Sequence, residues 1–133
     1  MKRILKTTLL ACLSVSHAAF GGIGDTYYCD VVEHVTYEKD AIQRYKPDRF
    51  TFRWNKNEIV FGKGGYFADS TAPISSDWSA RNIFSGGKDH ERLFFFDGRL
   101  RYVSAFFGTK EQADKMGFHE MRTIIADCSK FND

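Results

Sequence analysis

The sequence predicts an all-β protein, a mainly antiparallel small barrel or sandwich of about six to eight strands with one short helix near residues 110–116. Apolar and polar residues alternate with a period of two over several segments, and short turn motifs separate these segments. No long helical pattern lies between them that could connect parallel strands. Strands joined by tight turns pair as hairpins, so the predicted sheet is antiparallel.

The first predicted strand lies in DTYYCDVVEHVTYEKD, residues 25–40. Successive side chains of a strand point to opposite faces. The mostly apolar set occupies the odd positions, Tyr27, Cys29, Val31, Val35 and Tyr37. We therefore expect these five side chains on one buried face along the whole strand.

The next predicted element is a hairpin in RFTFRWNKNEIVFG, residues 49–62. Phe50, Phe52 and Trp54 share one face of its first strand, and 55–57 forms a turn into a second strand over 58–61. Pro47 cannot donate to a ladder, so the residues before the hairpin are expected to form a connection.

Residues 62–77, GKGGYFADSTAPISSD, are rich in Gly, Ser, Asp and Pro. This composition predicts a long connection with one short strand near Tyr66 and Phe67. Gly62–Gly65 lacks the spacing of a phosphate-binding loop and is interpreted as a turn or bulge. A further strand is expected between Trp78 and Ser85.

The segment RLFFFDGRLRYVSAFF, residues 92–107, contains an Asp97-Gly98 turn that favours a type I′ hairpin. This turn pairs Phe96 with Arg99, and the pairing continues outward along both strands. One face then carries Leu93, Phe95, Leu100 and Tyr102, and the other carries Phe94 and Phe96 beside Arg99 and Arg101. The hairpin is predicted to be part of a packed core, with guanidinium groups partly covering the outer rings. An aromatic face that holds a ligand is the alternative.

The C-terminal part of the chain predicts one helix followed by one strand. Thr109 and Gln112 fit a capping box, and Gly117 fits the position after a helix end. Residues 119–131 also fit a helical stripe, but their β-branched centre and the need to bring Cys128 to Cys29 favour a strand.

The first 18 residues have the features of a secretory signal peptide. Lys2, Arg3 and Lys6 precede an apolar run that ends at Ser16-His17-Ala18, a pattern typical of a cleavage site. The run is shorter than the about 20 residues that a membrane span needs, so no transmembrane segment is expected. The prediction is a single β-rich domain, 19–133, exported to the periplasm or the extracellular space. A lipoprotein anchored at Cys12 is the alternative.

The composition of the predicted mature chain bears on its partners. The whole chain has 19 Lys and Arg residues against 17 Asp and Glu residues, and the predicted leader contains three of the basic ones. The remainder is slightly acidic, which argues against a nucleic-acid partner. Two cysteines remain, Cys29 and Cys128, and an even count in an exported chain predicts a disulfide between them.

Evidence for catalysis in the sequence is weak. His34, His90 and His119 each stand beside a glutamate, and they could bind zinc only if folding brought them together. Adjacent strand residues point to opposite faces, so solvated polar positions are the favoured interpretation. No catalytic residue, metal site or cofactor is predicted.

Aromatic residues provide the candidate binding positions. Those that could line a cavity for an apolar ligand are Phe50, Phe52, Trp54, Tyr66, Phe67, Trp78, Phe95 and Tyr102. The same side chains could instead fill a small barrel completely, which is the favoured interpretation.

Size, predicted signal and a disulfide between the first and last strands resemble those of secreted barrels such as bacterial lysozyme inhibitors and small lipocalin-like proteins. The inhibitors' Ser-Gly-x-x-Tyr motif is absent, because Ser85–Asp89 reads Ser-Gly-Gly-Lys-Asp. The resemblance is one of architecture, and no functional residue is transferred from it.

The predicted function is an exported, non-enzymatic binding or interaction protein for a small apolar ligand or a protein partner. The alternatives are a secreted inhibitor of an extracellular enzyme and a metal-dependent hydrolase that uses the histidines.

Overall fold

The structure, a computed structural model, describes residues 22–38, 41–78, 81, 83–88, 90–105, 110–116 and 120–131. These residues form strands and one helix in the order β1 (Thr26–Glu38), β2 (Ala41–Arg44), β3 (Arg49–Trp54), β4 (Glu58–Phe61), β5 (Thr71–Trp78), β6 (Ile83–Gly86), β7 (Glu91–Phe96), β8 (Arg99–Ser104), α1 (Lys110–Met116) and β9 (Glu120–Lys130).

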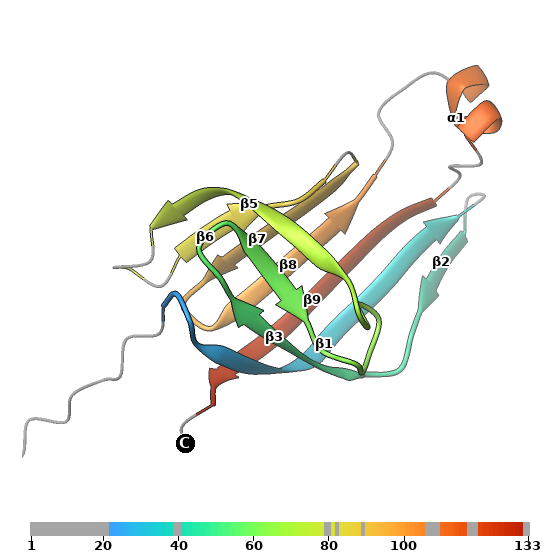
Figure 1. The fold of residues 1–133 in the computed structure, drawn as a ribbon. Coiled ribbons are helices and arrows are strands. Elements are labelled where there is room, and N and C mark those ends of the chain that lie inside the picture. Colours follow the sequence, from blue (N-terminus) through green and yellow to red (C-terminus); the bar gives the residue numbers. More distant parts are fainter. Residues whose placement is uncertain are drawn as a thin grey trace, which may run out of the picture.

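The strands form one antiparallel sheet that closes into a barrel (Figure 1). Strand β1 pairs with β3, the following strands pair in chain order up to β9, and β9 pairs back with β1. Strand β2 lies outside this closed circuit of eight strands and pairs with the end of β1. The predicted fold class, an all-β and mainly antiparallel small barrel or sandwich, is confirmed, and of the two architectures the structure has the barrel. The sheet has nine strands where about six to eight were predicted, because β2 lies outside the closed circuit.

The barrel has two different ends. At one end, which we call the mouth, lie the end of β1, the start of β9, the connection 62–70 and residues 87–88 and 90 between β6 and β7. At the opposite end lie the tight turns 55–57 and 97–98, and Phe131 donates a backbone hydrogen bond of 2.8 Å to Thr26. Figure 1 shows the described chain beginning and ending at this opposite end.

The end opposite the mouth is filled with aromatic side chains. Trp54, Phe84 and Phe95 are fully buried, with the Phe84 and Phe95 rings stacked at 5.2 Å. Tyr27 stacks on Phe52 with ring centroids 4.9 Å apart. These contacts leave the mouth as the part of the barrel where polar side chains enter the interior.

The hairpin of β7 and β8 has the predicted register. Phe96 pairs with Arg99, Phe95 with Leu100, Phe94 with Arg101 and Leu93 with Tyr102. The turn residues Asp97 and Gly98 have φ angles of 50° and 71°, as a type I′ turn requires. Phe95 is completely buried while Phe94 is 40% exposed, so the triple phenylalanine is confirmed as a core strand with one outer face.

The predicted face of β1 is wrong beyond Val31. Opposite β9, the register shifts between Val31 and Glu33, which inserts Val32 as a β-bulge. The extra residue exchanges the two faces, so Thr36 is fully buried and Tyr37 is 44% exposed. Val35 and Tyr37 therefore do not continue the buried face of Tyr27, Cys29 and Val31.

Residues 71–77, predicted to belong to a connection, are part of strand β5. This strand pairs with β4 on one side and with β6 on the other, so tertiary pairing overrides its unfavourable composition. Gly86 of β6 lies so close to β5 that an added Cβ would stand 2.1 Å from the carbonyl oxygen of Pro73. The short strand predicted near Tyr66 and Phe67 is wrong, because both residues lie in turns. Strand β2 was not predicted from the sequence.

The C-terminal predictions are confirmed, since β9 is a strand and α1 is a helix. The proposed cap residues Thr109 and Gly117 lie outside the described residues, as do the predicted signal peptide and Cys12. Within the described part of the chain, no helix has the length and apolar character needed to cross a membrane.

Candidate functional site

A row of polar residues crosses the inner face of four adjacent strands at the mouth. On β1 and β9, Thr36 is opposite Arg122, which is opposite Ser104 of β8, and Ser104 is opposite Glu91 of β7. The next row toward the core contains His34, Ile124, Tyr102 and Leu93. The polar row thus lies one layer above the apolar core.

The loop between β4 and β5 places Tyr66 over these two rows. The Tyr66 ring lies 5.4 Å from His34 and 5.9 Å from Tyr102 between centroids, and the Arg122 guanidinium carbon is 4.6 Å from its centre. We call His34, Tyr45, Tyr66, Glu91, Tyr102 and Arg122 the mouth cluster.

Arg122 is held by a carboxylate and an aromatic ring. Its Nη2 forms an ion pair of 2.6 Å with Oε1 of Glu120, and its guanidinium lies against Tyr66. Its Nε is shut off from solvent and has no hydrogen-bond partner among the described residues. The ion pair and the ring contact thus hold Nη2 and the face of the guanidinium within the protein.

His34 also lies inside the mouth, which differs from the solvated position predicted for it. Its ring stacks on Tyr45 at 4.4 Å, and its Nε2 is buried without a partner in the described part of the chain. Burial, followed by the positive charge of Arg122, lowers the pKa of His34, and Asp48 and Glu120 oppose this shift. The lowered pKa favours a neutral imidazole in the mouth.

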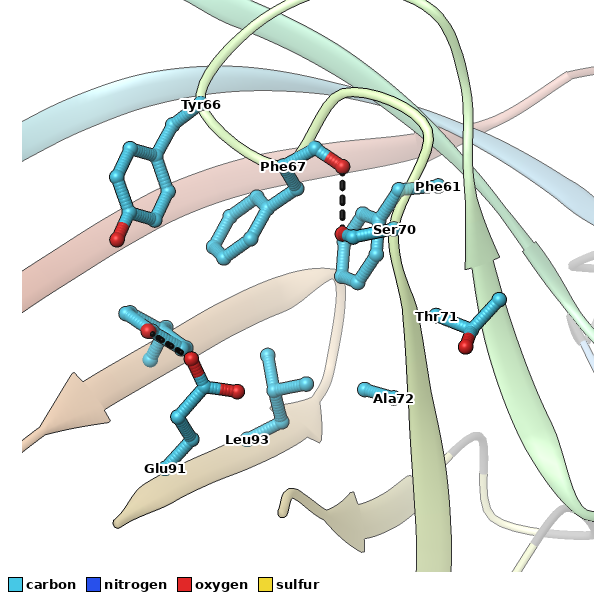
Figure 2. A pocket seen from close by; sticks show the side chains of 9 residues that line it. Phe61, Tyr66, Phe67, Ser70, Thr71, Ala72, Glu91 and Leu93 are labelled. Carbon is cyan, nitrogen blue, oxygen red and sulfur yellow. Dashed lines mark hydrogen bonds between the residues drawn. The ribbon is translucent and has the colours of Figure 1, made fainter. Parts of the chain in front are cut away.

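A partly enclosed pocket of about 240 Å³ lies beside the mouth cluster, between the 62–70 loop and strands β5, β7 and β8 (Figure 2). Its lining residues are Phe61, Tyr66, Phe67, Ser70, Thr71, Ala72, Glu91, Leu93 and Tyr102. The rings of Phe61 and Phe67 stack with their centroids 4.5 Å apart. The Phe67 ring packs edge to face against Tyr102, with ring centroids 5.0 Å apart. The pocket therefore has a continuous aromatic wall and a single carboxylate, that of Glu91.

Glu91 is oriented by Tyr102. The Tyr102 hydroxyl donates a hydrogen bond of 2.9 Å to Oε1 of Glu91, shown as a dashed line in Figure 2. Burial, with this hydrogen bond as the next contribution, raises the pKa of Tyr102, so the hydroxyl keeps its proton. No described residue donates to the second oxygen, Oε2. The carboxylate thus has one oxygen anchored and one available to the pocket.

The predicted aromatic positions divide into two groups. Phe50, Phe52, Trp54 and Phe95 are buried against one another in the filled part of the barrel. Tyr66, Phe67 and Tyr102 line the pocket at the mouth. Trp78 ends strand β5, and its side chain lies outside what the structure describes.

Of the three histidines considered as possible zinc ligands, the structure describes His34 and His90. His34 belongs to the mouth cluster, His90 precedes β7, and His119 is outside the described residues. Across the described ranges, no three His, Cys, Asp or Glu side chains form a group that could hold a metal ion.

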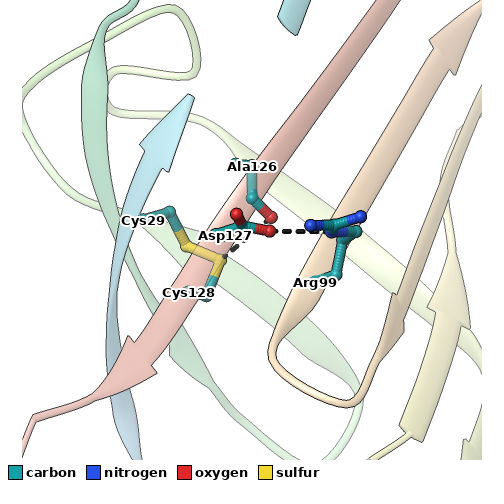
Figure 3. A network of polar contacts seen from close by, with 5 residues as sticks. All are labelled: Cys29, Arg99, Ala126, Asp127 and Cys128. Atoms are coloured by element: carbon teal, nitrogen blue, oxygen red, sulfur yellow. Dashed lines mark hydrogen bonds and ion pairs between the residues drawn. A yellow bond between two sulfur atoms is a disulfide. The ribbon is translucent and has the colours of Figure 1, made fainter. Parts of the chain in front are cut away.

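The predicted disulfide between Cys29 and Cys128 is present and joins β1 to β9, directly across the strand pair that closes the barrel (Figure 3). The two Cα atoms are 4.0 Å apart. Next to it on the outer face, Arg99 Nε forms an ion pair of 2.7 Å with Asp127. A disulfide is compatible with an exported protein.

Three residues of the mouth cluster, Tyr45, Glu91 and Arg122, were not among the candidate positions predicted from the sequence. For Glu91 a signal was present, because the predicted hairpin register extends by two residues to pair Glu91 with Ser104 on the inner face. For Arg122, the alternation of β9 also indicates the inner face, but its neighbours come from β1 and from the 62–70 loop.

Neither a protein-family model, nor a curated protein, nor a solved structure matches the chain at a significant level. The geometry of the mouth is therefore the basis on which a function can be proposed.

Proposed function

We propose that this chain is an exported, non-enzymatic binding protein that holds a small ligand in the pocket at the barrel mouth. The observation that supports this most directly is the contrast between the two ends of the barrel. One end is filled by aromatic side chains, whereas the mouth has a pocket of about 240 Å³ with an aromatic wall and convergent polar groups. Ligand sites in β-barrels often lie in the mouth and combine an apolar wall with few polar groups.

The volume limits the size of the ligand. A dry cavity of about 150 Å³ accommodates benzene, so this pocket suits a compact ligand of roughly ten non-hydrogen atoms. Phe61, Phe67 and Leu93 would contact its apolar body, in keeping with the apolar ligand expected from the sequence. Export agrees with the predicted signal peptide and with the disulfide.

Saturation-transfer NMR with 2-phenylethanol as a neutral probe of suitable size tests this function. The wild-type protein should bind the probe, and Ala72→Leu, which fills the pocket from β5, should remove binding. Ala41→Leu is a matched control, because Ala41 is exposed on β2 and does not line the pocket. Leu93→Phe fills the same pocket from β7 and provides a second test if Ala72→Leu does not fold. Unchanged binding in a folded pocket-filling variant would exclude this pocket as the site.

A further inference from the structure

We propose that the ligand of this pocket has a positively charged amine, bound by Oε2 of Glu91, while the surrounding aromatic rings contact its carbon skeleton. This inference rests on the proposed binding function and specifies the chemical class of the ligand. It follows from the position of one carboxylate within an aromatic wall.

The hydrogen bonding of Glu91 leaves one of its carboxylate oxygens available to a ligand. The Tyr102 hydroxyl donates a hydrogen bond of 2.9 Å to Oε1 of Glu91. None of the described Lys, Arg or His side chains forms an ion pair with this carboxylate. A partly buried carboxylate oxygen gains most from a charged donor, because charge-assisted hydrogen bonds are the stronger kind. An ammonium group in the pocket would supply that donor.

The aromatic wall beside this carboxylate also favours a cation. Phe61, Phe67, Tyr66 and Tyr102 contact one another through stacked, edge and tilted arrangements. The faces of aromatic rings attract cations. The protein already uses this interaction at the mouth, where the Arg122 guanidinium lies 4.6 Å from the centre of the Tyr66 ring.

The charged side chains at the mouth favour a ligand of positive charge. The inward positions of β7 and β9 closest to the mouth hold two carboxylates, of Glu91 and Glu120, and one guanidinium, that of Arg122. Arg122 is paired with Glu120 and does not line the pocket. This distribution favours a cation over an anion.

The test compares three probes that share a phenyl ring and a two-carbon chain: 2-phenylethylamine, 2-phenylethanol and phenylacetate. Titration calorimetry on the oxidised mature protein should show the amine binding at least about tenfold more tightly than the alcohol. Glu91→Gln keeps the size of the side chain and an acceptor for Tyr102, and it should abolish this preference. Glu91→Asp retains the charge and should retain part of it. Glu58→Gln removes a carboxylate exposed on β4 and should leave all three affinities unchanged.

The outcome for the alcohol and the outcome for phenylacetate test the inference separately from the proposed function. If the alcohol binds as tightly as the amine, the inference about charge is wrong and the binding function stands. If phenylacetate binds most tightly, the inference of a positively charged ligand is overturned. If none of the three probes binds, both the inference and the proposed function are refuted.

Discussion

Removing the disulfide that joins the first and last barrel strands should strongly destabilise the protein. Cys29 and Cys128 are 99 residues apart, so the bond closes almost all of the described chain into one loop. In the loop-entropy model, a cross-link of that length stabilises the native state by about 4 to 5 kcal/mol. Measured losses in small secreted domains are typically about 2–5 kcal/mol, and we expect Cys29→Ala with Cys128→Ala to fall in this range.

Urea unfolding followed by circular dichroism measures this loss of unfolding free energy, and thermal unfolding followed by the same signal measures the change in melting temperature. For a domain of this size, a loss of about 4 kcal/mol should lower the melting temperature by about 15 °C or more. Each single alanine substitution should cost nearly as much as the double substitution, because each removes the same bond. Reduction of the wild-type protein is the control, since it removes the cross-link and leaves both sulfur atoms in place.

Two results would refute this reasoning. A loss below about 1 kcal/mol in both the double variant and the reduced protein would show that the β1–β9 ladder closes the barrel unaided. Two reactive thiols in wild-type protein of residues 19–133, labelled under denaturing and non-reducing conditions, would show that the bond does not form.

Three further predictions concern the core, a turn and the mouth. Phe95→Ala should lower the free energy of unfolding by about 3–5 kcal/mol in urea titration, because the Phe95 ring is fully buried. Phe94→Ala should lower it by less than about 1 kcal/mol, because Phe94 is exposed. Equal losses would contradict the assigned faces of the strand. Gly65→Ala should lower the free energy of unfolding by about 2 kcal/mol or more in the same assay, because Gly65 has a φ of 79° and an added Cβ would stand 2.4 Å from a backbone oxygen. Gly64→Ala is the control and should be nearly neutral, because no atom lies within 4 Å of a Cβ added there. Equal effects of the two substitutions would contradict this prediction. His34 should titrate below its usual pKa of about 6.5 in NMR, because burial and then Arg122 disfavour its charged form against the opposing Asp48 and Glu120. The unfolded state then binds the proton more readily, so stability should fall as pH drops below about 6.5, and His34→Gln should reduce this slope; a midpoint above 6.5 would contradict the argument.

Several features of this protein follow from the sequence because they depend on neighbouring residues. The Asp97-Gly98 pair determines a hairpin turn, and the alternation around it assigns Phe95 to the core and Phe94 to the surface. The even number of cysteines outside the predicted leader indicates the disulfide. These signals are local or compositional, so they persist without knowledge of the fold.

The inner face of β1, the strand at β5 and the mouth cluster were decided only by tertiary structure. The Val32 bulge reverses the faces of β1 because β9 pairs with the strand on both sides of the extra residue, and no pattern within β1 records that pairing. Strand β5 forms because β4 and β6 both pair with it, despite its Ser, Asp and Pro content. Glu91, Tyr66 and Arg122 come from β7, from a loop and from β9, so only closure of the barrel brings a carboxylate, an aromatic ring and a guanidinium together at one mouth.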